Sequence, residues 1–297
     1  MTKTVKHPAL DYSLTFDSTY HTYTDDEGNR YTSGTRIVKA AFPAFDAPAT
    51  AARVSVKFGS VWCGMTPAAI LAAWKAKGAA TSDLGHRVHA YAEARILGLE
   101  PALAVSDEER LARAAVDAAL IDIDRHYEIL GAEQIVFCPL NRLAGTIDLP
   151  ARNRATGATA ILDWKINETI DDDGWGRTGL PPVEDIPDSK AAHYALQLSL
   201  YAWIMQDSGY IHTDAPVELA LIHIPPGATA ADWLPLEYLR EQVARIVDAR
   251  WSRRIVPASP AGLTDGDGEG GGPAPGSPEP PDARKGPQND SGGKPPF

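Results

Sequence analysis

The chain has 297 residues, with 28 Lys and Arg against 39 Asp and Glu, and a formal net charge of −11. Hydrophobic residues make up 44% of it and charged residues 23%, which is typical of a globular protein of one large or two small domains. The two cysteines, Cys63 and Cys138, are too few for a disulfide framework or a four-cysteine iron–sulfur cluster. The negative charge argues at first against nucleic acid as a partner.

No segment of the sequence indicates targeting to a membrane. The start has no apolar run typical of a signal peptide, and no stretch approaches the roughly 18 apolar residues of a membrane span. Residues 257–297 hold 10 Pro and 10 Gly among 41 residues. We therefore expect a soluble, cytoplasmic protein with no membrane partner and a disordered Pro/Gly-rich tail at 257–297.

The first forty residues predict a β-hairpin, because β-forming residues flank the turn cluster Asp25–Asn29. Residues 1–60 are expected to be an N-terminal extension packed on a core domain that spans 61–256. The helices expected next lie at 67–78, at 82–97 and, opened by a capping box, at 106–131.

Further along, short apolar runs between turn residues predict β-strands. They lie at 133–140, 143–150 and 158–166, followed by a helix at 189–206, a strand at 217–225 and a last helix at 234–253. This order predicts an α/β (α+β) fold with a mixed central sheet flanked by helices. The long connection at 168–189 is expected to form a flap over a substrate, with Trp175 stacking on a base.

Two carboxylates and an ammonium are predicted to share one face of a hairpin. The turn at Asn153–Gly157 pairs Asp148 with Asp163 when residues are counted outward from it, which brings their Cβ atoms to about 5 Å. Strand alternation puts Lys165 on the same face and Trp164 on the opposite one. The two carboxylates repel unless a cation lies between them, and Mg²⁺ or Mn²⁺ prefers such oxygen ligands.

This set of groups suits phosphodiester hydrolysis. A divalent ion offsets developing negative charge, and a lysine whose pKa is lowered by burial and by the ion orients or deprotonates water. The alternative is a surface ion pair of Asp148 with Lys165 and a solvated Asp163. A zinc hydrolase that uses His86, His89 and Glu93, spaced along one helical face, is a further alternative.

Four motifs in chain order resemble those of the PD-(D/E)XK nuclease superfamily, in the branch that contains the RecB and AddAB nuclease domains and phage exonucleases. They are Gly85-x-x-x-His89, Gly145-x-x-Asp148, Asp163-x-Lys165 and Gln197-x-x-x-Tyr201. The resemblance covers roughly residues 80–225 and implies a restriction-endonuclease-like αβββαβ core. Ile147 stands where the family's name has proline.

The resemblance also implies roles for individual residues. Asp148, Asp163 and Lys165 would be catalytic. One or two Mg²⁺ or Mn²⁺ ions would be held by His89, Asp148, Asp163 and the backbone carbonyl of Trp164. Gln197 and Tyr201 would position the substrate, and the helper residues would be Glu93, Glu133 and His193. No iron–sulfur cluster is expected.

The function that follows is a Mg²⁺- or Mn²⁺-dependent DNA nuclease, an exonuclease rather than an endonuclease, acting in phage or prophage DNA recombination or processing in a bacterial host cell. The alternatives are a catalytically silent DNA- or protein-binding member of the same fold and a metal-dependent hydrolase of a non-nucleic substrate. A terminal Pro296-Phe297 resembles the docking tip of bacterial single-stranded-DNA-binding proteins, so a single-strand annealing or binding protein is a possible partner. Because the chain is acidic, DNA binding is expected to depend on the metal.

Overall fold

The computed structural model describes residues 2–255, so the predicted tail and its docking tip lie outside the described residues. The described chain divides into two compact units, residues 2–44 with 81–255 and residues 45–80. This division does not coincide with the predicted boundary at residue 60. The first 44 residues belong to the larger unit, because their last strand is hydrogen-bonded into one of its sheets.

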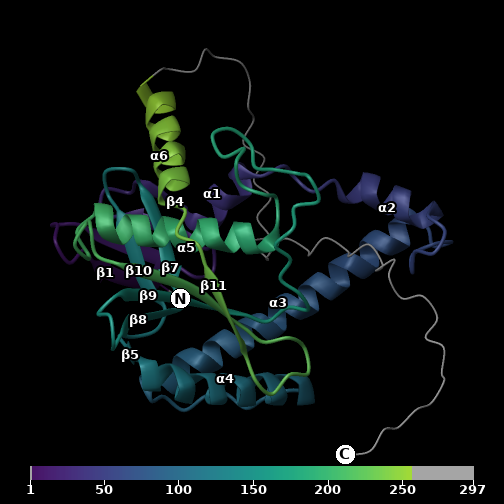
Figure 1. Ribbon diagram of the computed structural model, residues 1–297, viewed down its shortest axis with the longest axis horizontal. Coiled ribbons are helices and arrows are strands. Elements are labelled where there is room, and N and C mark those ends of the chain that lie inside the picture. Colours follow the sequence, from purple (N-terminus) through teal and green to yellow (C-terminus); the bar gives the residue numbers. More distant parts are fainter. Residues whose placement is uncertain (1, 256–297) are drawn as a thin grey trace, which may run out of the picture. The chain divides into compact units, whose positions relative to one another are not determined.

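The larger unit is a mixed α/β fold with two sheets (Figure 1). The first sheet has the strand order β1 (Thr2–Lys6), β2 (Ser13–Asp17), β3 (Thr22–Asp25), β4 (Arg30–Ser33), β7 (Leu143–Ile147), β6 (Gln134–Cys138). The second has the order β11 (Asp232–Leu236), β10 (Val217–His223), β9 (Thr159–Lys165), β8 (Leu149–Asn153), β5 (Tyr127–Ile129). Each sheet contains one parallel pair, β4 with β7 and β9 with β10.

The α/β class is therefore confirmed, whereas the single central sheet is wrong. The predicted strand 143–150 is two strands, β7 and β8, which separate at Asp148 and belong to different sheets. The two strands separate because a side chain takes the place of a backbone carbonyl. Asp148 Oδ2 accepts the backbone N–H of Trp164 at 3.1 Å. In the part that remains paired, the predicted register of β8 with β9 is confirmed, from Leu149 opposite Leu162 to Arg152 opposite Thr159.

Six helices occur in the described chain. They are α1 (Gly34–Ala41), α2 (Ala47–Val56), α3 (Pro67–Leu97), α4 (Asp107–His126), α5 (Lys190–Asp207) and α6 (Arg240–Ile255). The predicted break near Gly78 is wrong, because a glycine inside a helix costs only about 1 kcal/mol and α3 continues through it. Gly98, with φ +66°, follows the last residue of α3 as expected.

Two other helix boundaries differ from the predicted ones, and two helices, α1 and α2, were not predicted. The helix expected to reach residue 131 ends at His126, where β5 begins. The helix expected at 234–253 begins at Arg240, because Trp233 and Leu234 pair with β10 in an edge strand that accommodates Pro235. Helix α1 was not predicted, although Ser33 caps it by accepting the Arg36 N–H at 3.3 Å.

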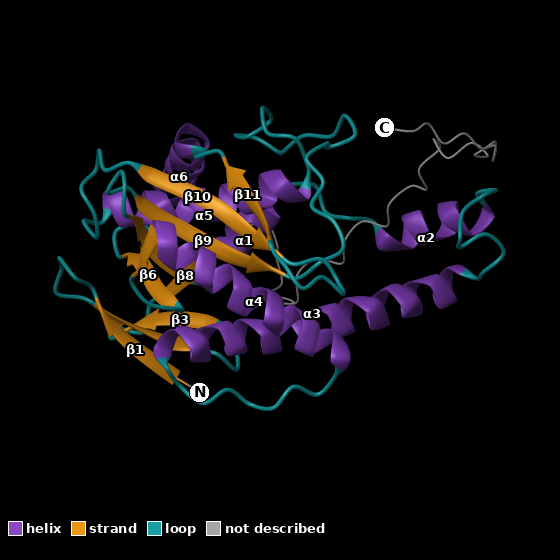
Figure 2. Cartoon of the chain, turned by 60° about the horizontal axis from the view of Figure 1, so that its bottom comes forward, coloured by secondary structure: helices purple, strands orange, loops and turns teal. Residues whose placement is uncertain are grey.

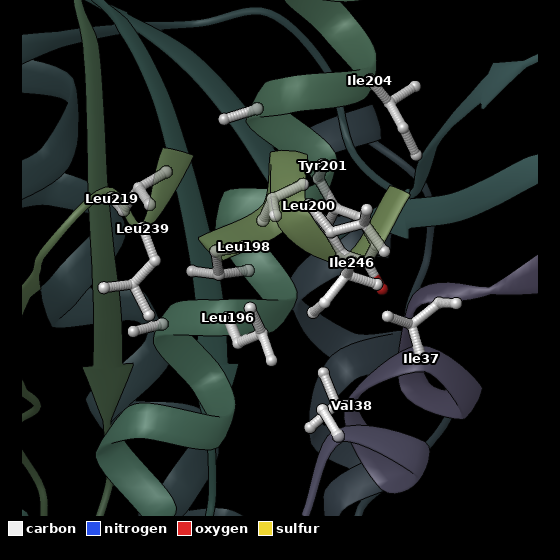
Figure 3. Packing of buried hydrophobic residues seen from close by; sticks show 14 of the residues in the cluster. Ile37, Val38, Leu196, Leu198, Leu200, Tyr201, Ile204, Leu219, Leu239 and Ile246 are labelled. Carbon is white, nitrogen blue, oxygen red and sulfur yellow. The ribbon is translucent and has the colours of Figure 1, made fainter. Parts of the chain in front are cut away.

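Strand β9 separates two hydrophobic clusters by its alternation. Ile161 belongs to a cluster with α5 and α6 residues on one side. Figure 3 shows Leu196, Leu198 and Leu200 of α5 and Ile246 of α6 in this cluster. Leu162 and Trp164 pack on the other side with residues of α3 and α4, which Figure 2 shows along that face. Trp164 thus points away from the face of Asp163 and Lys165, as predicted.

Two glycines make room for one buried tyrosine. A Cβ on Gly145 would lie 2.1 Å from Cε1 of Tyr201, and a Cβ on Gly34 would lie 2.6 Å from the same atom. The ring, which is 3% exposed, therefore fits only because both neighbours lack side chains. This contact joins α5 to the strand that leads to Asp148.

Gly145→Ala is expected to destabilise the protein by about 1–3 kcal/mol, because the new methyl group overlaps the Tyr201 ring and the buried ring has no room to move. Urea unfolding measures the difference. Gly85→Ala is the matched control: it lies in α3 with nothing within 4 Å of the added Cβ, so it should be neutral or slightly stabilising. Equal midpoints for the two variants would contradict the contact.

A buried carboxylate ties α3 to α4. Glu109 is fully buried and accepts hydrogen bonds from Arg87 Nε at 2.9 Å, Arg113 at 2.6 Å and the Val105 N–H at 3.2 Å. Burial alone would raise its pKa, but these donors lower it below the ordinary 4.5. The capping box is thus only half as predicted: Ser106 accepts the Glu109 N–H, while the Glu109 carboxylate turns to the arginines.

Glu109→Gln is expected to cost about 3–5 kcal/mol of stability at pH 7, because two arginines lose their buried partner. A group with a lowered folded-state pKa stabilises above its unfolded pKa. The advantage of the wild type should therefore be complete above about pH 4.5 and shrink as the pH falls through the lower folded value. Urea unfolding at pH 7 and pH 3 checks this, and a constant difference would contradict it.

Candidate metal centre

Three potential ligands converge from separate elements of the larger unit. His89 lies on α3, Glu133 directly precedes β6, and Asp148 lies between β7 and β8. One ligand atom of each residue lies within 4.8 Å of the others, and all three side chains are partly exposed. His89 and Asp148 are predicted ligands, whereas Glu133 was expected only as a helper. An imidazole with two carboxylates is a donor set that suits a divalent ion.

His89 lies between two acceptors. Its Nε2 lies 3.0 Å from the Trp164 carbonyl, and its Nδ1 lies 3.2 Å from Asp148 Oδ2. The carbonyl only accepts, so Nε2 donates, and Nδ1 either donates to the carboxylate from a protonated ring or offers its lone pair to a cation. A cation bound by Nδ1 and Asp148 would take the place of that proton. The geometry therefore fits the ion that the motifs imply.

Glu133 is held in a conformation that few residues adopt. Its φ is +49°, and its N–H donates to the Asp148 carbonyl at 3.0 Å. Burial and the charge of Asp148, with smaller contributions from Glu93 and Asp163, raise the pKa of Glu133 to about 8. Four carboxylates gathered in this way leave a proton on one of them unless a cation is present.

Lys165 lies beside this cluster and is paired with Asp163. Its Nζ contacts Asp163 Oδ2 and lies 3.4 Å from the Trp164 carbonyl and 4.8 Å from the ring centroid of Tyr194. Burial would lower the pKa of Lys165, but Asp163 and Asp148 raise it above its ordinary value. The predicted lowering depends on a bound metal ion and stays a prediction. Burial in turn raises the pKa of Asp163, although Lys165 opposes the shift.

Two predicted ligands thus have other partners here. Asp163, the most buried of the four carboxylates at this site, is bound to the ammonium of Lys165, and the carbonyl of Trp164 accepts from His89. Asp148 lies close enough for its charge to raise the pKa of Asp163. The surface ion pair of Asp148 with Lys165 is wrong, because Asp163 and not Asp148 holds the ammonium.

Of the two residues predicted to position the substrate, Gln197 and Tyr201, only Gln197 is accessible to solvent. Gln197 is partly exposed and donates from Nε2 to the Tyr201 hydroxyl at 2.9 Å. Tyr201 is buried between two glycines, so its role is to hold Gln197. A second tyrosine supports the strand to Asp148, since Tyr23 Oη lies 2.9 Å from Thr146 Oγ1.

The remaining candidates lie outside the ligand cluster. His193 Nε2 is 2.9 Å from Asp188 Oδ1, and its ring is 3.9 Å from that of Phe42, so it is part of the packing of α5. Glu93 lies one turn beyond His89 and acts on Glu133 through its charge. His86 is exposed and outside the cluster. Trp175, with φ +52°, is 67% exposed on the predicted loop before α5.

Sequence reasoning missed Lys3, which donates to the Glu133 carbonyl at 3.1 Å. It also missed the assembly of β1–β4 with β7, which brings Tyr23 to Thr146. No local pattern signals such contacts. Glu133 itself follows Gly131, the end of the predicted helix, and that position hinted at a turn before the strand.

Comparisons with known proteins leave the family open. No family model matches the chain, and no curated protein matches it. One of the solved structures that match is titled "Crystal structure of SSO0001"; it is 15% identical, with a TM-score of 0.21, over 57% of this chain and 74% of that one. In residues 2–255, no helix is long and apolar enough to cross a membrane.

Without divalent ions, Glu133→Gln is expected to stabilise the protein at pH 8 and to have little effect at pH 5. The folded-state pKa of about 8 exceeds the ordinary 4.5, so wild-type stability falls as the pH rises between these values. A gain of up to about 4 kcal/mol is expected at pH 8, since each pKa unit between 4.5 and about 8 corresponds to about 1.4 kcal/mol. Thermal unfolding across this pH range measures it.

Glu128→Gln, at an exposed position on β5, is the control and should follow the wild type. Saturating Mn²⁺ should raise the unfolding temperature of the wild type more than that of Glu133→Gln, because a ligand that binds only the folded state stabilises it. If the stability of the wild type and that of Glu133→Gln changed in the same way with pH, the raised pKa of Glu133 would be contradicted.

Proposed function

We propose that the protein is a Mg²⁺- or Mn²⁺-dependent DNA nuclease that hydrolyses phosphodiester bonds. The observation that carries the proposal is the His89–Glu133–Asp148 ligand cluster next to the buried Asp163–Lys165 pair. The expectations of exonuclease action, of a role in phage or prophage recombination and of a bacterial cytoplasm rest on the motif resemblance and belong to the same proposal.

The residues that would hold the ion are His89, Glu133 and Asp148, with Asp163 adjacent. A divalent ion bound there would supply positive charge to a phosphate oxygen and acidify a bound water. Glu133 must release its proton to act as a ligand, so its raised pKa makes binding pH-dependent. His89 contributes the Nδ1 lone pair while its Nε2 is held by the Trp164 carbonyl.

Lys165 carries its proton in the present arrangement, because Asp163 and Asp148 stabilise the ammonium. It therefore serves as a hydrogen-bond donor that orients a phosphate oxygen or the attacking water. A cation that binds the carboxylate of Asp163 weakens the ion pair between Asp163 and Lys165, and it thereby lowers the pKa of the Lys165 ammonium. Gln197, held by Tyr201, offers a second polar group to the substrate.

Asp163→Ala and Lys165→Ala are each expected to reduce Mn²⁺-dependent cleavage of DNA by at least about a hundredfold, because each removes a group that acts on the reacting phosphate or water. An end-labelled duplex, compared with circular DNA, measures the rate and separates exo- from endonuclease action. Lys6→Ala, an exposed lysine on β1, is the control and should cleave normally.

Because Asp163 and Lys165 are a buried pair, circular dichroism must show that each variant is folded, and Asp148→Asn provides a milder substitution. Calorimetric titration with Mn²⁺ gives a readout without activity. Wild-type protein that binds no Mn²⁺ and cleaves no DNA would favour the catalytically silent alternative. Hydrolysis of small phosphodiesters but not DNA would favour the non-nucleic substrate.

A further inference from the structure

The smaller unit, residues 45–80, contains three aromatic rings that contact one another. It consists of α2, the loop 57–66 and the first half of α3. The ring of Trp74 lies 5.9 Å from that of Trp62, edge-on, and 6.1 Å from that of Phe45, while Ile70 is fully buried. The unit is therefore a helix–loop–helix hairpin whose aromatic rings contact one another.

The hairpin is basic in an acidic chain. Residues 47–82 are the longest stretch without Asp or Glu, whereas the whole chain has a net charge of −11. The stretch contains four exposed cations, which are Arg53, Lys57, Lys75 and Lys77. Among the described residues, Arg53, Lys57 and Lys75 have no ion-pair partner, whereas Arg87, Arg113 and Arg245 in the larger unit each bind a carboxylate.

The tip of the hairpin exposes large apolar side chains. Val56, Phe58 and Val61 are 79%, 98% and 84% exposed. The loop that carries them is closed by hydrogen bonds, from Ser60 N to Lys57 O at 3.1 Å, from Cys63 N to Ser60 O at 3.0 Å and from Gly64 N to Ser55 O at 2.8 Å. An ordered loop that directs apolar groups into water is typical of an interaction surface.

We propose that this hairpin is a nucleic-acid-binding surface, called the grip below. Its cations bind phosphates, and Phe58 packs on bases at a DNA end or in a single strand. The choice of DNA rests on the proposed function. Charge complementarity supports it, because Arg53, Lys57 and Lys75, which have no ion-pair partner within residues 2–255, bind a polyanion without first breaking ion pairs. Exposed aromatic groups beside cations are the usual means of binding bases and backbone together.

The spread of the cations favours a nucleic-acid strand over a membrane surface. Lys75 lies eight residues beyond Pro67, which is about 12 Å along α3 at 1.5 Å per residue. A lipid surface that received the apolar tip would act on charges only within roughly a Debye length of about 8 Å. A strand that runs along the hairpin contacts cations on α2, on the loop and on α3.

The grip changes the expected role of the metal. The acidic net charge predicts that DNA binding needs a divalent ion, but the hairpin offers a basic surface that needs none. DNA is therefore expected to bind in EDTA. Cleavage would still require the metal centre, so binding and catalysis separate experimentally.

The test compares three full-length proteins: wild type, Arg53→Gln/Lys57→Gln/Lys75→Gln, and the control Lys6→Gln/Arg30→Gln/Lys39→Gln. The control loses the same charge from exposed positions of the larger unit. Binding to a fluorescent DNA duplex is measured in EDTA over a range of salt concentrations. The hairpin variant should bind at least tenfold more weakly, and its salt slope should fall by about 2 to 3, at about 0.9 per lost phosphate contact.

A fourth variant, Phe58→Ser, should weaken binding to a single-stranded oligonucleotide by roughly tenfold with little effect on circular duplex. Unchanged binding by the hairpin variant, or an equal loss in the control, would overturn the proposal. So would binding to anionic phosphatidylserine vesicles that is lost in the hairpin variant while DNA binding is kept, which would assign the hairpin to a membrane surface.

Cleavage assays with Mn²⁺ keep this proposal separate from the proposed function. If the wild type binds DNA through the hairpin but never cleaves it, the nuclease assignment fails and the grip stands. If cleavage proceeds with the same KM in the hairpin variant, the grip fails and the nuclease assignment stands. With both correct, the hairpin variant raises KM and leaves kcat unchanged at saturating DNA.

Discussion

The arrangement of the larger unit depends on how the chain passes Asp148. Its carbonyl accepts the N–H of Glu133, its carboxylate accepts the N–H of Trp164, and the same carboxylate faces His89. One residue thereby connects the strand β6, the strand β9 and the helix α3, and it marks the point where β7 ends in one sheet and β8 begins in the other. The ligand cluster is a direct result of this junction.

Electrostatics at the junction are unfavourable in the absence of a cation. Asp148, Glu133 and Asp163 repel one another, and only Asp163 has a full ammonium partner. Structures usually avoid uncompensated carboxylates that are partly buried. Their presence here, together with the left-handed backbone of Glu133, is typical of a site where binding rather than stability selects the arrangement.

Local patterns in the sequence predicted much of this site. The turn at Asn153 fixes the register of β8 and β9, so the pairing of Leu149 with Leu162 follows from counting residues. The sheet change at Asp148 could not be predicted in this way, because it depends on a side chain that replaces a backbone acceptor. The contribution of Glu133 and Lys3 depends on strands far apart in the chain, and periodicity carries no information about such contacts.

The burial of Tyr201 between Gly34 and Gly145 has a consequence for sequence variation. The three positions belong to α5, to the start of α1 and to β7, and they are distant in the chain but share one volume. A related chain that keeps the aromatic ring must keep room for it on both sides, whereas one with a small residue at the tyrosine position can carry side chains at the other two. Covariation among these three positions would therefore record a steric constraint and not a shared chemical role.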